Sequence, residues 1–263
     1  MTKGDELRAA IAAQGSVLVM FSGGLDSALL AKLAHDALGQ RAAALTIDSS
    51  VVPRSETALA KEVADAIGVR RYVLTLDEIG LAHFAANPVD RCYHCRKHRD
   101  AEAWRWAHEH GLDTVADGLN YSDLSDYRPG LKAASEDRIW HPFIELRVTK
   151  DDIRTLSREL ELPGWDRPSM ACLASRFPHG FAVTGDRLKR VDRAEEYLRA
   201  LGFKKVRVRY FPYELGLVEV DDLQRALEHR DQIVARLREL GFGFVALHLE
   251  DFASGTMNRT AGA

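Results

Sequence analysis

Residues 17–27, with the sequence VLVMFSGGLDS, constrain the fold of this chain more than any other segment. An apolar run ends at Phe21 and passes directly into polar residues and two glycines, a pattern typical of a buried strand that turns into a helix. The first amides of a helix have no intrahelical acceptor and lie at the positive end of the helix dipole, so such a turn binds anions. The sequence therefore predicts a pyrophosphate-binding loop over residues 22–27.

Each residue type in this loop suits that task. Gly23 and Gly24 allow the main chain to approach phosphate oxygens, Ser22 and Ser27 add hydroxyl donors, and Asp26 is placed to cap the helix or to face a magnesium ion. The loop has neither the lysine of a Walker A loop nor the three glycines of the dinucleotide fingerprint. The alternative is a strand-to-helix turn in which the glycines serve backbone geometry alone.

The first half of the chain alternates strand and helix patterns and predicts an α/β fold. We expect strands over 17–21, 42–47, 71–76 and 114–116, and helices over 27–38, 55–67 and from about 95 to 109. Strands separated by helices of this length form a parallel sheet, and ligands bind beyond the carboxyl ends of its strands. Residues 22–27, 48–50 and 117–120 are expected to gather there.

The pattern changes after Gly180. A helix over 185–201, strands over 206–210 and 215–220, a helix over 222–240 and a strand over 244–249 predict a small α+β domain. The stretch before it is rich in Pro, Gly, Asp and Ser and contains one helix, which begins near Lys150 after a Thr149 cap. We therefore expect a parallel-sheet domain over 1–180 and an α+β domain over 181–263.

Charge and hydropathy limit the partners. Lys and Arg total 36 against 39 acidic residues, a net charge of −3, which argues against a broad nucleic-acid surface. No apolar run approaches the ~20 residues of a membrane span, and the first residues lack the apolar block of a signal peptide. The expectation is a cytoplasmic protein with neither nucleic-acid nor membrane partners.

The three cysteines are Cys92, Cys95 and Cys172, and their odd number favours metal binding or reactivity over a disulfide scaffold. The CxxC fits a redox dithiol, a zinc half-site completed by His94 or His98, or part of an iron–sulfur ligand set. Three thiolates without an obvious fourth ligand suit a four-iron cluster with one open iron. The alternative is three small buried apolar side chains.

Charged residues in the second half supply further candidates. Arg176 lies four positions after Cys172, and nearby positive charge favours a nucleophilic thiolate. Arg207 and Arg209 alternate along a predicted strand, so both project from one face and suit a phosphate, although solvent-facing arginines are the alternative. Glu195 is able to form an ion pair with these arginines or to bind a metal. The alternative is that Glu195 is an ordinary exposed carboxylate on its helix.

The string SGGLDS matches the PP-loop of the ATP pyrophosphatases, which split ATP between its α and β phosphates and use the AMP half to activate a carbonyl or carboxylate. A narrower resemblance covers about residues 5–258. The chain resembles the ATP-dependent sacrificial sulfur transferases that build the nickel-pincer nucleotide cofactor of lactate racemase. This resemblance rests on SGGLDS at 22–27, DGLNYSDLSDYRPGLKAA at 117–134, PFIELRVTKDDIR at 142–154, PSMACLASRFPHG at 168–180 and VRVR at 206–209.

The resemblance implies a specific reaction. The enzyme uses ATP and magnesium to adenylate a carboxylate of pyridinium-3,5-dicarboxylic acid mononucleotide, and pyrophosphate is released. A sulfur nucleophile then displaces AMP, and two rounds yield the bisthiocarboxylate. In members with only the cysteine that matches Cys172, that side chain donates its sulfur and becomes dehydroalanine. Members that also carry a CxxC hold a [4Fe-4S] cluster on three cysteines, and its open iron carries a sacrificial sulfide.

The same resemblance implies the residue roles. Cys92, Cys95 and Cys172 would ligate the cluster, Arg207 and Arg209 would grip the substrate phosphate beside Glu195, and Arg176 would steady phosphate near the reactive sulfur. The ATP-binding residues would be Ser22, Gly23, Gly24, Asp26, Ser27, Asp48 and Gly118. A sulfide donor and homo-oligomeric assembly are also implied. The segment after VRVR, YFPYELGLVEV, departs from the short polar turn usual in the family.

Three other functions share some of these features. A tRNA thiolase also combines a PP-loop with cysteines, but it requires a basic RNA-binding surface. A ligase of the asparagine synthetase or NAD synthetase type shares the loop and has no use for three cysteines in this arrangement. A non-catalytic sensor of nucleotide and cluster is the alternative from a different class.

Overall fold

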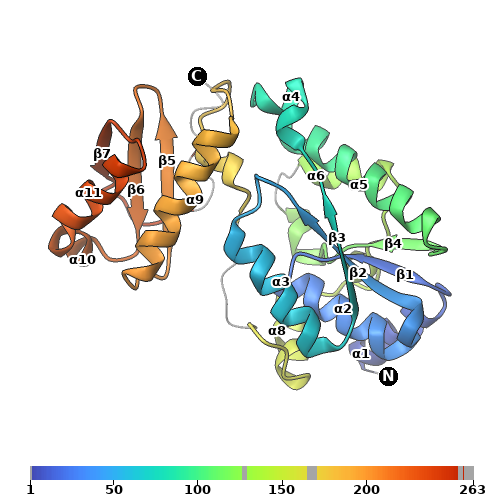
Figure 1. Ribbon diagram of the computed structural model, residues 1–263. Helices are drawn as coiled ribbons and strands as arrows, with labels where there is room; N and C mark the ends of the chain where they lie inside the picture. The colour runs from blue at the N-terminus through green and yellow to red at the C-terminus, as the bar shows by residue number, and fades with distance from the viewer. Residues whose placement is uncertain (1, 126–128, 165–170, 254–256, 258–263) are drawn as a thin grey trace. The chain divides into compact units, whose positions relative to one another are not determined.

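The computed structural model describes residues 2–125, 129–164, 171–253 and 257 (Figure 1). Residues 126–128 and 168–170, which are parts of two blocks of the family resemblance, lie outside the described residues. The chain divides into two compact units. The first comprises Met1–Ser49, Arg54–Leu76 and Cys92–Met170, and the second comprises Ser50–Pro53, Asp77–Arg91 and Ala171–Ala263. Residues 171–180, placed by sequence in the first domain, thus count with the second unit, as do two short segments of the first half.

The first unit contains the parallel sheet that the sequence predicts. Its strand order is β3-β2-β1-β4, and every neighbouring pair is parallel. Val17 lies opposite Ala42 on one side and Thr114 on the other. The strands are β1 (Val17–Met20), β2 (Ala42–Asp48), β3 (Arg70–Thr75) and β4 (Thr114–Ala116).

Helices cover both faces of this sheet, which makes the unit α/β (Figure 1). Val17 and Val19 pack in one core cluster, whereas Leu18 between them packs in another with residues of α5. Successive residues of a strand point to opposite faces, so burial on both faces explains the uninterrupted apolar run of β1. The main helices are α1 (Lys3–Ala12), α2 (Leu25–Leu38), α3 (Arg54–Ile67), α5 (Arg91–Glu109), α6 (Pro129–Glu136), α7 (Pro142–Glu145) and α8 (Lys150–Glu159).

The predicted cap of α8 is confirmed. The Oγ1 of Thr149 accepts from the amide of Asp152 at 3.2 Å, and the Asp152 carboxylate accepts from the Thr149 amide at 2.8 Å. This reciprocal capping box satisfies two backbone donors at the helix start. It also makes Lys150 the first residue of α8.

The second unit contains the small α+β arrangement that the sequence predicts. A hairpin of two antiparallel strands pairs with a third strand parallel to its second member. The predicted helix over 222–240 is two helices, because the backbone of His229 leaves the helical conformation and caps both. The elements are α4 (Ala82–Ala85), α9 (Gly185–Ala200), β5 (Val206–Phe211), β6 (Leu215–Val220), α10 (Leu223–Glu228), α11 (Arg230–Glu239) and β7 (Phe244–Leu247).

Helix α9 contributes an apolar face to the core of this unit. Leu188, Val191, Ala194 and Leu198 recur at helical spacing and are buried. Val206 and Val208 of β5 are buried as well. Among the residues that the structure describes, no helix has both the length and the apolar character needed to cross a membrane.

Candidate active site

The carboxyl ends of three neighbouring strands place the first group of candidate residues at one edge of the parallel sheet. Strand β1 leads into the loop at 22–27, β2 ends at Asp48, and β4 is followed by Asp117 and Gly118. Because β1 is paired with both other strands in parallel, these segments lie at the same edge. The sheet thus brings together the residues that the sequence predicts to bind ATP.

Hydrogen bonds from the hydroxyl groups of Ser22 and Ser27 stabilise the loop of residues 22–27. The Oγ atoms of Ser22 and Ser27 lie 3.2 Å apart, Ser27 Oγ donates to the carbonyl of Gly24 at 3.0 Å, and the Gly24 amide donates to Ser22 Oγ at 3.3 Å. Gly24 is the N-cap of α2 and has no side chain to cap it. The amides of this first turn have no intrahelical acceptor and form the start of an anion site.

Glycine is required at positions 23 and 118, because at each of them the backbone of another segment lies too close for a side chain. Gly23 has a φ of +78°, and a Cβ there would lie 2.6 Å from Cα of Ala60 in α3. A Cβ on Gly118 would lie 2.8 Å from the backbone carbonyl carbon of Asp26. Both approaches are too close for any other residue, so α3 and the turn after β4 hold the loop from two sides.

Asp26, in the first turn of α2, pairs with a lysine that sequence reasoning missed. Its Oδ1 lies 2.5 Å from Nζ of Lys150, at the start of α8. The helix start at Lys150 was predictable, whereas its pairing with a carboxylate 124 residues away was not. Asp48 pairs with Arg54, with 2.7 Å between Oδ1 and Nη1. Cationic groups therefore accompany both candidate carboxylates.

A buried network supports the turn that contains Gly118. Asp117 accepts from Nη2 of Arg96 at 2.5 Å, from Nδ1 of His141 at 2.6 Å and from the amide of Leu119 at 3.0 Å. Burial raises the pKa of Asp117, but the hydrogen bond from His141 and the charge of Arg96 outweigh it, so the pKa is lowered. The other ring nitrogen of His141 is buried without a hydrogen-bond partner. The sequence placed Asp117 at this edge of the sheet but did not indicate its partners Arg96 and His141.

The loop of Cys172 lies in the second unit and is held by Arg176. The Nη1 of Arg176 donates to the carbonyl oxygens of Ala171 at 3.0 Å and Cys172 at 3.3 Å. The amide of Leu173 donates to the carbonyl of Val51 at 2.9 Å. Arg176 is 1% exposed, so its guanidinium is a fixed part of the loop.

Glu195 of α9 binds the other side of Arg176. Its two oxygens accept from Nε at 2.8 Å and Nη2 at 3.0 Å, and it also accepts from Arg199 at 2.8 Å and from the amide of Val208 at 3.1 Å. Glu195 is fully buried, so it is not an ordinary exposed carboxylate. Burial lowers the pKa of Arg176, but the charge and hydrogen bonds of Glu195 outweigh it and raise that pKa.

Arg209 is buried and committed to partners within the protein. Its Nε and Nη2 donate to the two oxygens of Glu219 at 3.0 and 2.9 Å, and its Nη1 donates to the carbonyl of Ser175 at 2.9 Å. It is 2% exposed. A solvent-facing arginine is therefore wrong for this position, and Arg209 ties β5 to the Cys172 loop.

Arg207 is more available than Arg209. It is half-buried, its Nη1 donates to the carbonyl of Ala253 at 3.0 Å, and its guanidinium lies 4.7 Å from the ring centre of Phe252. Burial lowers the pKa of Arg207, and the positive charges of Arg209 and Arg176 lower it further. An anion bound at Arg207 would relieve this repulsion.

None of the three cysteines is in a disulfide, and none is fully buried. Cys92 is exposed, whereas Cys95 and Cys172 are partly buried. Cys92 and Cys95 lie near the start of α5 and, three residues apart, share one face of that helix. The alternative of three small buried apolar side chains is therefore wrong.

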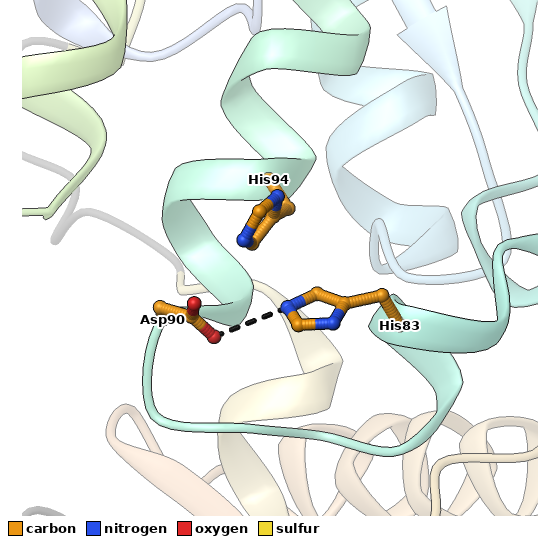
Figure 2. A group of neighbouring side chains, drawn as sticks. All are labelled: His83, Asp90 and His94. Carbon is orange, nitrogen blue, oxygen red and sulfur yellow. Dashed lines mark hydrogen bonds and ion pairs between the residues drawn. The ribbon is translucent and has the colours of Figure 1, made fainter.

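His83 and Asp90, two exposed residues that precede the CxxC, form a pair at the surface. The Nε2 of His83 in α4 lies 3.2 Å from Oδ1 of Asp90, as Figure 2 shows. The same view labels His94, which lies between the two cysteines of α5. His83 and Asp90 are both exposed, so their pairing contributes little to stability.

Comparisons with known proteins cover nearly the whole chain. The asparagine synthase family matches residues 4–137. The chain is 36% identical to the pyridinium-3,5-bisthiocarboxylic acid mononucleotide synthase of Lactiplantibacillus plantarum, over 98% of this chain and 95% of that protein. It is 38% identical to an uncharacterized protein of Synechocystis sp., over 98% and 97% of the two chains. An uncharacterized protein of Methanocaldococcus jannaschii is 30% identical, over 90% and 91%.

Proposed function

The chain belongs to the family of the pyridinium-3,5-bisthiocarboxylic acid mononucleotide synthase, and on that premise we propose that it is an ATP-dependent sulfur transferase acting on pyridinium-3,5-dicarboxylic acid mononucleotide. The observation that carries the proposal is 36% identity to the named synthase along both units. The match to the asparagine synthase family agrees with an ATP-using PP-loop, but it ends at residue 137, before Cys172.

The first half-reaction is an adenylation at the loop of residues 22–27. A substrate carboxylate oxygen attacks the α-phosphorus of ATP, the bond to the β-phosphate oxygen breaks, and pyrophosphate leaves. The hydroxyls of Ser22 and Ser27 and the first amides of α2 support phosphate binding here. Asp26 is the carboxylate at this loop that suits magnesium, and Lys150 beside it suits the phosphates. Asp48 and Gly118 complete the proposed ATP site.

The second half-reaction transfers sulfur. In protein without a bound cluster, the thiolate of Cys172 attacks the acyl adenylate, the bond from carbonyl carbon to the AMP oxygen breaks, and AMP leaves. Removal of the Cys172 Hα with cleavage of its Cβ–S bond then leaves a thiocarboxylate on the substrate and dehydroalanine in the protein. The guanidinium of Arg176 supports this role because it fixes the Cys172 carbonyl and adds positive charge beside the thiol. The proposal requires that Cys172 reach the adenylate during the reaction.

The cysteines also fit a [4Fe-4S] cluster with three protein ligands. None of Cys92, Cys95 and Cys172 is in a disulfide or fully buried, which suits thiolate ligation. When bound, such a cluster supplies an open iron for an external sulfide, so that Cys172 is not consumed.

The phosphate of the substrate is assigned to Arg207, with Arg209 and Glu195 in support. Arg207 combines partial exposure with repulsion from two neighbouring guanidiniums, which an anion relieves. Arg209 and Arg176 are held by Glu219 and Glu195, so they position the site. Arg207 is thus proposed to bind the phosphate and Arg209 to position the site, although the alternation along the strand gives no difference between the two arginines.

Release of pyrophosphate tests the function directly. The purified protein should release pyrophosphate from ATP when the pyridinium dicarboxylate mononucleotide is added, and should not respond to tRNA. Mass spectrometry after one turnover should show Cys172 intact in anaerobically reconstituted protein, and loss of hydrogen sulfide from the Cys172 peptide only in protein without bound iron. A response to tRNA alone would identify a thiolase, and binding of ATP without pyrophosphate release in any mixture would identify a sensor. A cytoplasmic location, an external sulfide donor and homo-oligomeric assembly stay predictions.

A further inference from the structure

A short segment before the CxxC, residues 85–91, is bonded at several points to the loop that carries Cys172. From these contacts we propose that Asn87 is a positioning residue for Cys172: it fixes the backbone of residues 174–183, and through it the direction of the thiol. The assignment of sulfur transfer to Cys172 rests on the proposed function, whereas the positioning itself does not.

The side chain of Asn87 serves the Cys172 loop rather than its own segment. Its Nδ2 donates to the carbonyl of Pro178 at 2.7 Å and to that of Phe181 at 3.2 Å, with a longer contact of 3.4 Å to Phe177. Asn87 is completely buried. A buried amide whose donors all point to one loop has a specific role, because leaving those carbonyls unpaired costs about 1–3 kcal/mol each.

The backbone of the same segment adds two further bonds. The amide of Gly180 donates to the carbonyl of Asn87, and the amide of Val183 donates to that of Ala85, both at 2.8 Å. Asn87 has a φ of 57°, in the left-handed region that asparagine tolerates better than most residues. The conformation and the side-chain chemistry therefore both select asparagine at this position.

Arg91 extends the contact to the immediate neighbourhood of Cys172. It is 5% exposed, and its Nη1 donates both to Oδ1 of Asn87 and to the carbonyl of Ala174. Within the loop itself, Arg176 donates to the Cys172 carbonyl. Hydrogen bonds from Asn87, Arg91 and Arg176 thus fix the backbone that carries the thiol of Cys172.

Two substitutions separate positioning from folding. Asn87→Asp keeps the shape and the acceptor but removes the amide donors and faces a carboxylate toward carbonyl oxygens. Asn87→Gly keeps the left-handed backbone and the two backbone bonds but removes the side chain. Thr184→Ala is the matched control, because it removes the cap of α9 next to the loop, at a cost of about 1 kcal/mol, without touching Asn87 or the loop carbonyls.

The readouts are local and do not all depend on catalysis. In hydrogen exchange, both Asn87 variants should lose protection over residues 172–183, while Thr184→Ala should lose it at the start of α9. The rate of alkylation by iodoacetamide, resolved by peptide, should change at Cys172 by at least about 10-fold in both variants. The rate at Cys92 should stay unchanged. Unchanged exchange and alkylation in two folded Asn87 variants would overturn the proposal.

Kinetics then connect the position to the chemistry. Because a displacement of about 1 Å is able to cost about 100-fold in rate, Asn87→Asp should lower thiocarboxylate formation by that order, with the KM for ATP unchanged. Equal losses of thiocarboxylate formation in Asn87→Asp and Thr184→Ala would show that only stability matters. That result would also overturn the proposal that Asn87 positions Cys172. If the wild-type protein forms no thiocarboxylate, the proposed function fails, while exchange and alkylation still decide the role of Asn87.

Discussion

Lys150 and Asp26 form an ion pair with 2.5 Å between Nζ and Oδ1, although 124 residues separate them in the chain. Asp26 lies in the first turn of α2 and Lys150 is the first residue of α8, so the pair joins the pyrophosphate loop to a second helix start. In the proposed reaction, ATP phosphates compete for the lysine and magnesium competes for the carboxylate.

Lys150→Met should therefore weaken ATP binding. Loss of one charged phosphate contact of about 1.5–3 kcal/mol corresponds to a rise in the KM for ATP of about 10- to 100-fold. Lys32→Met is the control, because Lys32 forms a comparable pair with Asp36 on the surface of α2 and has no proposed contact with ATP. Steady-state pyrophosphate release at varied ATP measures both, and equal KM values would remove Lys150 from the site.

Asp26→Asn should reduce adenylation by at least about 100-fold, because it removes the carboxylate assigned to magnesium. The cysteines are untouched, so anaerobic reconstitution should still yield the iron content of the wild type. Pyrophosphate release and iron analysis on the same sample separate the two halves of the site. Full release from this variant would contradict the role of Asp26.

Cys172→Ala should adenylate the substrate and transfer no sulfur. The variant keeps the carbonyl that Arg176 binds, so the loop backbone is retained. Pyrophosphate should appear in the assay while mass spectrometry of the nucleotide shows no thiocarboxylate. Continued transfer would assign the sulfur to another group.

Arg207 and Arg209 should respond differently to alanine. Arg209→Ala leaves Glu219 buried without its partner, so the free energy of unfolding should fall by about 3–5 kcal/mol. Arg207→Ala should cost less than about 1 kcal/mol of that free energy, yet raise the KM for the nucleotide substrate about 10- to 100-fold. Urea denaturation and substrate titration measure these effects, and the reverse assignment would show that Arg209 holds the phosphate.

Acid should weaken the start of α8. The hydrogen bond from Lys3 lowers the pKa of Asp152 to about 2, opposed by burial and aided by Thr149. A depressed folded-state pKa stabilises the protein above pH ~4, and this contribution is lost as the pH falls toward 2. Solvent screening limits it to about 1 kcal/mol. Asp152→Asn should remove that amount at pH 7 and flatten the acid limb of the unfolding free energy, whereas Asp151→Asn, at an exposed neighbouring position, should do neither.

Sequence patterns predicted the elements that depend on local chemistry. The apolar run of β1, the glycines of the loop and the capping residues of α8 each act over a few residues, and the structure contains all three. The break at His229 escaped prediction, because the stretch over 222–240 contains neither glycine nor proline to mark it. The boundary predicted near residue 180 also used local composition, whereas two short segments of the first half count with the second unit.

By itself, the sequence determined a parallel-sheet α/β unit with a loop typical of anion binding, and a smaller α+β unit. Only the tertiary structure decided that Asp26 faces Lys150, that Glu195 holds Arg176, and that Asn87 secures the loop of Cys172. Periodicity and capping are properties of neighbouring residues, whereas these partners meet only when distant segments pack together. A charged or amide side chain finds its partner through the topology of the chain, and no local pattern encodes that choice.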